Sequence, residues 1–130
     1  MKLFTTLIVV LCVVSLNGCK KPLIDYRKKY LGDYSFSIHE SSYIGGISYD
    51  TSYTDEGTLS KGSDVQSIQI TFSLHDAIEF VLYEDGSFQV KNCNYNSCIG
   101  EFESLNKMRY TLFWWALPGQ GTESVTGTRK

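Results

Sequence analysis

The chain has 130 residues, of which 20% are charged, and its formal net charge is −2. The basic residues form no stripe of the kind that nucleic-acid binding needs, so we expect no nucleic-acid partner. Aromatic residues make up 14% of the chain, and this enrichment, together with scattered glycines, is typical of β-strands.

The first element in chain order is an export signal, predicted for residues 1–18. A positive start, Met1-Lys2, is followed by an apolar run over residues 3–16, as in secretory signal peptides. This run is shorter than the roughly 20 apolar residues that a membrane-spanning helix needs. We therefore expect residues 1–18 to be a cleaved signal peptide.

The end of this segment, Leu16-Asn17-Gly18-Cys19, resembles the Leu-x-Gly-Cys lipobox of bacterial lipoproteins. The resemblance implies that Cys19 is acylated, for example with palmitate, and becomes the mature N-terminus. More than one acyl chain gives stable membrane anchoring. Lys20, where an aspartate would favour the inner membrane, implies the outer membrane facing the periplasm. The alternative is a soluble secreted protein cut near Gly18.

Residues 19–30 are predicted to be the lipidated N-terminus and a basic tether. Two interpretations of the tether stay open. Its lysines and arginine can rest on anionic lipid head groups, where each charge adds about 1 kcal/mol. It can equally be a solvated linker with one helical turn from Leu23 to Tyr30.

Beyond residue 30, apolar residues alternate with polar ones, as in Tyr34, Phe36 and Ile38. A period of two indicates half-buried strands. Turn signals such as Gly45-Gly46 and Asp85-Gly86 separate the runs. The predicted strands cover residues 33–41, 46–54, 57–61, 65–74, 77–83, 87–92, 99–104, 107–115 and 122–128.

These strands predict a single all-β domain over residues 31–130. Because the piece at 57–61 can continue the strand before it, we expect an antiparallel meander of about eight strands. Such a meander closes into a small, lipocalin-like barrel, which removes exposed edges, or folds into a β-sandwich.

Two cysteines remain in this domain once the signal and lipid site are set aside. Cys93 and Cys98 flank a turn-like stretch, residues 94–97. In an oxidising compartment we expect a disulfide between them, with a stabilisation of about 2 kcal/mol because the loop is short. A metal site would need two further ligands, and the sequence has no second cysteine pair to supply them.

Several weak motifs follow one another along the chain. They are Gly32-Asp33-Tyr34, Tyr53-x-x-Glu56-Gly57-Thr58-Leu59, the hairpin from Tyr83 to Phe88, Phe102, the aromatic strand ending at Trp115, Gly119-x-Gly121 and Val125-x-Gly127-x-Arg129-Lys130. Together with the lipobox, this order resembles a family of small, uncharacterised bacterial lipoproteins with a lipocalin-like or related meander β-barrel. The resemblance covers essentially the whole mature chain. It implies the fold, and it implies no particular activity or ligand.

The two histidines, His39 and His75, each precede a carboxylate. Adjacent residues on a strand face opposite ways, so neither pair can chelate a metal together. The chain also lacks a Gly-x-Ser-x-Gly nucleophile elbow. We therefore expect no catalytic residues, no metal and no cofactor. An enzyme centred on His75 would require His39 and a carboxylate close to it.

Adjacent tryptophans mark the strand predicted at 107–115. If Trp114 shares the core face with Leu112, then Trp115 and Phe113 face outward. An outward aromatic pair can stack on a sugar or an apolar ligand, or form a protein interface. The alternative is that residues 119–121 cover the pair.

Tyr49 and Tyr53 provide a second candidate aromatic cluster, together with Tyr43. We predict a membrane-anchored, non-catalytic domain that binds a small apolar or glycan ligand. The alternative is a protein–protein accessory or inhibitor module of the cell envelope. An interior cavity would favour the first, and a filled core with an exposed Trp115–Phe113 patch would favour the second.

Overall fold

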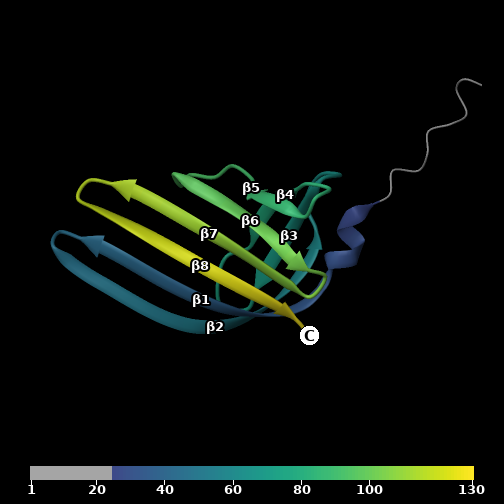
Figure 1. Ribbon diagram of the computed structural model, residues 1–130, viewed down its shortest axis with the longest axis horizontal. Coiled ribbons are helices and arrows are strands. Elements are labelled where there is room, and N and C mark those ends of the chain that lie inside the picture. The colour runs from purple at the N-terminus through teal and green to yellow at the C-terminus, as the bar shows by residue number, and fades with distance from the viewer. Residues whose placement is uncertain (1–24) are drawn as a thin grey trace, which may run out of the picture.

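A computed structural model describes residues 25–130 (Figure 1). The expected signal peptide and Cys19 lie outside the described residues. One short 3₁₀ helix precedes eight strands: η1 (Tyr26–Tyr30), β1 (Gly32–Ile44), β2 (Ile47–Lys61), β3 (Ser67–Phe72), β4 (Ile78–Leu82), β5 (Ser87–Val90), β6 (Ser97–Ser104), β7 (Lys107–Ala116) and β8 (Gly119–Arg129).

The eight strands form a closed antiparallel barrel in which each strand pairs with the next along the chain. β1 also pairs with β8, from Tyr34 opposite Arg129 to Ile44 opposite Gly119, and this ladder closes the barrel. The prediction of an all-β meander barrel is confirmed. The sandwich alternative is wrong because all eight strands belong to one sheet, which the pairing of β1 with β8 closes on itself.

Several strand boundaries differ from the predicted ones. The pieces at 46–54 and 57–61 are one strand, β2, which pairs with β1 without a break. β3 is shorter than 65–74 because a turn closed by the Ser67 amide and the Asp64 carbonyl holds its start. β6 and β8 begin earlier than expected, since Ser97 pairs with Phe113 and Gly119 with Ala116.

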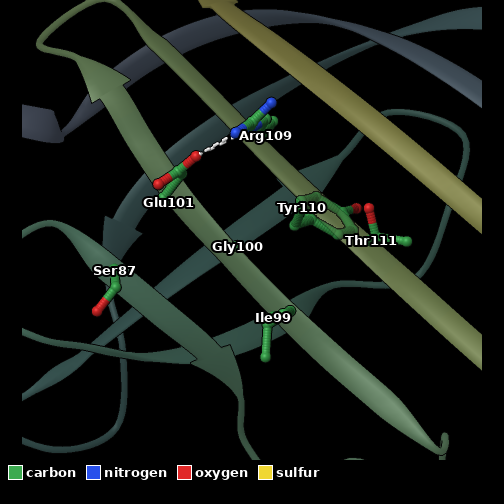
Figure 2. Close-up of a pocket in the computed structure, with 7 residues that line it drawn as sticks. All are labelled: Ser87, Ile99, Gly100, Glu101, Arg109, Tyr110 and Thr111. Carbon is green, nitrogen blue, oxygen red and sulfur yellow. Dashed lines mark hydrogen bonds and ion pairs between the residues drawn. The ribbon is translucent and has the colours of Figure 1, made fainter.

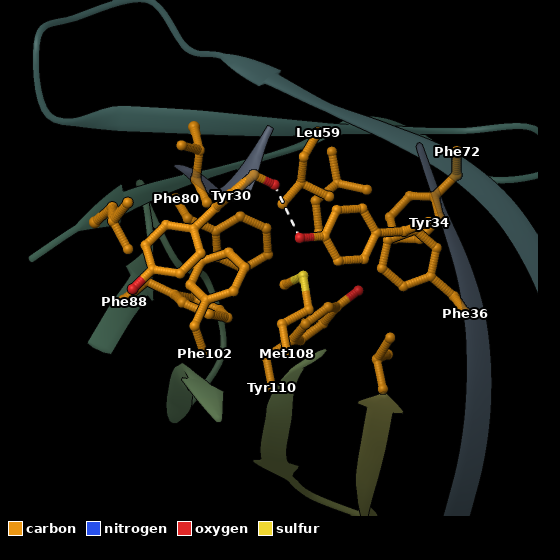
Figure 3. Close-up of a cluster of buried hydrophobic side chains, with 14 of the residues drawn as sticks. Tyr30, Tyr34, Phe36, Leu59, Phe72, Phe80, Phe88, Phe102, Met108 and Tyr110 are labelled. Atoms are coloured by element: carbon orange, nitrogen blue, oxygen red, sulfur yellow. Dashed lines mark hydrogen bonds between the residues drawn. The ribbon is translucent and has the colours of Figure 1, made fainter. Parts of the chain in front are cut away.

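Aromatic and aliphatic side chains fill one half of the barrel interior (Figure 3). Tyr34, Phe80 and Met108 are all fully buried there. The Phe80 and Phe88 rings meet edge to face with centroids 4.9 Å apart, a geometry that aromatic pairs prefer. This half of the interior is a packed core, as alternating inward side chains predict for a small barrel.

Phe36 lies in this core between two glycines on the neighbouring strands. A Cβ on Gly127 would lie 2.6 Å from the Phe36 ring, and one on Gly57 would lie 3.0 Å from it. Both distances are shorter than an ordinary van der Waals contact. The barrel wall therefore needs glycine at these two positions to seat the ring.

η1 closes the barrel at this packed end. The Tyr30 ring stacks on Phe102 with centroids 3.8 Å apart, and the Tyr34 hydroxyl donates to the Tyr30 carbonyl at 2.8 Å (Figure 3). The Arg27 guanidinium is buried and donates to the Asp64 carbonyl at 2.7 Å. Residues 26–30, which we assigned to the tether, therefore cap the barrel.

This packing limits the interpretation in which the basic residues of the tether rest on lipid head groups. Arg27 also pairs with Asp25 at 2.7 Å, so its charge is compensated inside the protein and is not available to lipid head groups. Lys28 and Lys29 remain exposed.

At the other end, the β1–β2 and β7–β8 hairpins extend together beyond the shorter strands β3–β6 (Figure 1). Because β1 pairs with β8, the two hairpins form one four-stranded extension. Within residues 25–130, no helix is both long and apolar enough to cross a membrane.

Candidate ligand-binding site

The barrel opens at the end opposite η1, and we call this opening the mouth. One cavity of about 200 Å³ lies there above the apolar side chains of Ile38, Phe72, Ile78 and Leu112. A second cavity of about 280 Å³ lies along the extension. Tyr95 and Glu123 line both cavities, so the two adjoin at these side chains, and we call them together the hollow.

Asp55 supplies a buried carboxylate to the wall of the mouth. It is 3% exposed and accepts hydrogen bonds from the Glu56 amide at 2.7 Å and the Leu74 amide at 3.2 Å. Burial alone would raise the pKa of Asp55, but these bonds and the one from His75 hold it below its usual value. Asp55 therefore stays ionised near neutral pH.

His75 is fixed by this carboxylate. Its Nδ1 lies 2.7 Å from Asp55 Oδ2, and because a carboxylate only accepts, Nδ1 carries the proton. The ring also stacks on Tyr53 at 5.1 Å between centroids and meets the Phe72 edge at 6.0 Å. Nε2 is thus the ring atom left for a bound molecule.

Two further carboxylates lie in the hollow on β1 and β8. Glu40 accepts a hydrogen bond from the Tyr53 hydroxyl, and burial together with this bond raises the pKa of Tyr53. Glu123 lies directly opposite Glu40 in the β1–β8 ladder. Burial raises the pKa of the Glu123 carboxyl, and the charge of Glu40 adds to the rise.

Tyr110 lies at the floor of the hollow and is 2% exposed. Its hydroxyl is buried and has no hydrogen-bond partner within residues 25–130. Burial strongly raises its pKa, so the hydroxyl keeps its proton. An unpartnered buried polar group costs about 1–3 kcal/mol, so it is a feature that calls for an explanation.

Aromatic rings line the outer part of the hollow. Trp114 lies on the inner face of β7, and its indole lies against Gly121, where a Cβ would approach within 2.4 Å. Tyr95 belongs to the loop between β5 and β6 and is 45% exposed. Together they give the hollow an aromatic rim.

The four aromatic residues that we proposed from the sequence do not converge. Tyr53 lies in the mouth, and Tyr49 lies farther out on the same face of β2, 54% exposed. Phe113 and Trp115 lie on the outer face of β7, and Trp115 is 60% exposed, so residues 119–121 do not cover it. The alternation predicted for Trp114 and Trp115 is present.

Cys93 and Cys98 lie at disulfide distance, with their Cα atoms 6.3 Å apart. They bracket the loop that presents Tyr95 to the hollow. His39 is on the outer face of β1, where Nδ1 lies 2.9 Å from the Ser52 hydroxyl. His75 lies in the bend after β3 and lines the mouth, so the two histidines are on different surfaces of the barrel.

A separate pocket of about 380 Å³ lies on the wall formed by β5, β6 and β7 (Figure 2). Its charged groups, Arg109 and Glu101, form an ion pair with each other. It is open, and its two charged side chains already neutralise each other. The mouth is the better candidate because it holds buried polar groups that the protein itself leaves available.

Within residues 25–130, no group of three or more histidine, cysteine, aspartate or glutamate side chains is arranged to hold a metal ion. We did not predict Asp55, Tyr110 or Glu123 as site residues from the sequence. The sequence did offer one signal for Asp55. It is a carboxylate on the same strand face as Tyr53 and Gly57, a face that points into the barrel.

The fold defines the class of protein as an eight-stranded antiparallel meander barrel. No family model and no curated protein matches the chain. Among solved structures, the crystal structure of the ywiB protein from Bacillus subtilis is similar, with a TM-score of 0.35 and 7% identity, covering 80% of this chain and 98% of that chain. At this level of likeness, nothing about ligand or activity transfers to this chain.

Proposed function

We propose that this chain is a lipid-anchored bacterial envelope protein whose barrel binds a small ligand in its mouth and does not catalyse a reaction. The observation that carries the binding proposal is the Tyr110 hydroxyl, buried and unpartnered at the floor of an open hollow. A ligand with a polar group at this depth would remove the cost of leaving the hydroxyl unpaired.

The lining of the hollow supports a small ligand with both apolar and polar parts. Its floor is apolar, its rim is aromatic, and a few polar groups point into it, which is the usual make-up of a ligand site. The inner cavity, about 200 Å³, exceeds the roughly 150 Å³ that holds a benzene molecule. Apolar and glycan fragments both satisfy these conditions.

We propose binding instead of catalysis because of what surrounds His75. Its Nδ1 is fixed by Asp55, yet no hydroxyl or thiol of the described residues is hydrogen-bonded to the ring as a nucleophile would be. The Asp55–His75 pair then serves to hold the wall of the mouth and to present one ring nitrogen.

The binding proposal is tested by melting the protein in the presence of a fragment panel of sugars, alcohols, amines and small aromatics. We expect at least one fragment to raise the melting temperature, since a ligand that binds only the folded state stabilises it. Ile78→Trp, which fills the cavity floor, should abolish the rise. Ile99→Trp, on the exposed outer wall, is the matched control and should keep it.

Tyr110→Phe is a second variant for the case in which Ile78→Trp does not fold. It removes only the unpartnered hydroxyl and should weaken binding of any fragment that reaches it. A panel with no stabilising fragment, or a rise that persists in the folded Ile78→Trp variant, would refute the proposal.

The alternative function, a protein–protein module, is favoured by a different observation. The extension carries exposed apolar side chains, with Ile47 57%, Tyr49 54% and Trp115 60% exposed. If this surface binds an envelope protein, Ile47→Ser should abolish cross-linking to that protein in cells. The same variant should leave fragment binding at the mouth unchanged.

The anchoring proposal rests on the sequence Leu16-Asn17-Gly18-Cys19 and on the resemblance to bacterial lipoproteins. The outer membrane, facing the periplasm, is the proposed location because Lys20 follows the cysteine. We expect the wild-type protein to enter the detergent phase in a phase separation and Cys19→Ser to remain in the aqueous phase. Entry of Cys19→Ser into the detergent phase would contradict lipidation at this residue.

A further inference from the structure

We propose that the ligand of the mouth is a small organic cation, in which an ammonium group lies between Glu40 and Glu123 and an aromatic or aliphatic body rests on the apolar floor. This inference rests on the proposed binding function and names the chemical class of the ligand. It uses the charges, the hydrogen-bonding groups and the size of the hollow.

The charge of the hollow has one sign. Among the described residues, its lining includes the carboxyl groups of Glu40, Asp76 and Glu123 but no lysine or arginine. The Asp55–His75 pair adds no net positive charge, because the carboxylate compensates the ring when it is protonated. A phosphate, a sulfate or a fatty-acid carboxylate would therefore meet repulsion at the mouth.

The hollow offers hydrogen-bond acceptors to a ligand. Glu123 is half-buried and faces Glu40 across the β1–β8 ladder. Its carboxyl group accepts no hydrogen bond from a side chain or amide within residues 25–130. The Tyr110 oxygen can also accept. An ammonium group carries three donors and no acceptor, so it complements two carboxylates and a phenol oxygen.

The aromatic residues suit the same ligand. Tyr95 and Trp114 line the hollow beside Glu123, and cations are attracted to aromatic faces within about 6 Å of the ring centre. The apolar floor formed by Phe72 and Leu112 has room for a body larger than benzene. An arylalkyl amine thus combines the charge, the donors and the size that the site can accept.

The experiment compares three probes of one shape: benzylamine, benzyl alcohol and benzoate. Affinities are measured by isothermal titration at pH 7 and about 0.15 M salt, where attraction to distant surface charges is screened. For the wild-type protein we expect benzylamine to bind at least about tenfold more tightly than benzyl alcohol, and benzoate to bind least.

Glu123→Gln removes the charge and keeps the shape of the side chain. We expect it to lower the affinity for benzylamine at least about tenfold while changing that for benzyl alcohol less than about threefold. Glu84→Gln, an exposed position in the β4–β5 turn, is the matched control and should change neither affinity. If Glu123→Gln does not fold, the order of the three probes on the wild-type protein still decides the question.

The outcomes separate this inference from the proposed function. Benzyl alcohol binding as tightly as benzylamine, or sugars stabilising the protein where amines do not, would overturn the cation and leave the binding site standing. A loss of benzylamine affinity in Glu84→Gln equal to that in Glu123→Gln would also overturn it. Failure of every fragment on the wild-type protein would instead overturn the binding function itself.

Discussion

Asp55 is the buried charge that organises the mouth, since it accepts bonds from two backbone amides and from His75. Asp55→Asn keeps the size of the side chain but replaces one accepting oxygen with an NH₂ group, which then faces another N–H donor. We expect the free energy of unfolding to fall by about 1–3 kcal/mol, as measured by urea denaturation. Asp76→Asn, at the exposed position next to His75, is the control and should change the free energy of unfolding by less than about 0.5 kcal/mol. An equal effect of both variants would contradict this assignment.

The same residue makes stability depend on pH. The folded-state pKa of Asp55 is lowered, so its contribution is complete above the unfolded-state pKa, near 4, and is lost as the pH falls through the folded-state pKa. Acidifying from about pH 5 to pH 3 should therefore reduce the unfolding free energy of the wild-type protein more than that of Asp55→Asn. Urea midpoints at both pH values measure the difference. Equal losses would show that Asp55 is not responsible.

The Phe36 ring packs in the core only because position 127 has no side chain. Gly127→Ala places a methyl group within 2.6 Å of the Phe36 ring, so we expect a loss of about 1–3 kcal/mol from overpacking. Phe36→Leu, added to Gly127→Ala, should cost less than the sum of the two single changes because the smaller side chain relieves the contact. Additive losses would mean that the ring and the glycine are not coupled.

At the scale of elements, the loop between β5 and β6 carries both the cysteine pair and Tyr95, a side chain of the candidate site. Cys93 and Cys98 bracket residues 94–97, and Tyr95 in this stretch lines both cavities. Replacing both cysteines with serine should cost about 2 kcal/mol, the low end for a disulfide, because the loop is short. It should also weaken fragment binding, since Tyr95 is then held less firmly. Melting and titration of the double variant, with Ser97→Ala as control, measure both effects.

The elements also show what the sequence could predict and what it could not. The period of two placed all eight strands, because inward and outward side chains alternate wherever one face is buried. η1 was assigned to a tether because its basic residues suggested solvent exposure, whereas Arg27 is buried on backbone carbonyls from a distant turn. Such long-range partners leave no local signal in the sequence.

The site was less predictable than the barrel for the same reason. Tyr53 was proposed as an aromatic contact and does lie in the mouth. His75 was considered beside Asp76, its sequence neighbour, but it pairs with Asp55, twenty residues earlier in the chain. The β2–β3 register brings these two residues together, and a register cannot be derived from the pattern of either strand alone.

At the scale of the whole molecule, closure joins the two ends of the domain. Tyr34 pairs with Arg129, so the β1–β8 ladder forms only after nearly the entire domain is in place. Long-range pairing of this kind slows folding, and we expect refolding from urea in milliseconds to seconds. Stopped-flow fluorescence of the tryptophans measures the rate. Complete refolding in microseconds would contradict a rate limited by closure.

The cap formed by η1 also gives the barrel a direction. With one end sealed by Tyr30 and Arg27, a molecule held in the mouth would enter and leave through the same portal, so the domain resembles a cup instead of a tube. If lipid is attached at Cys19, at most about 22 Å of chain separates it from Asp25 at the sealed end. The sealed end, and not the mouth, would then be the end of the barrel that is tied to the membrane.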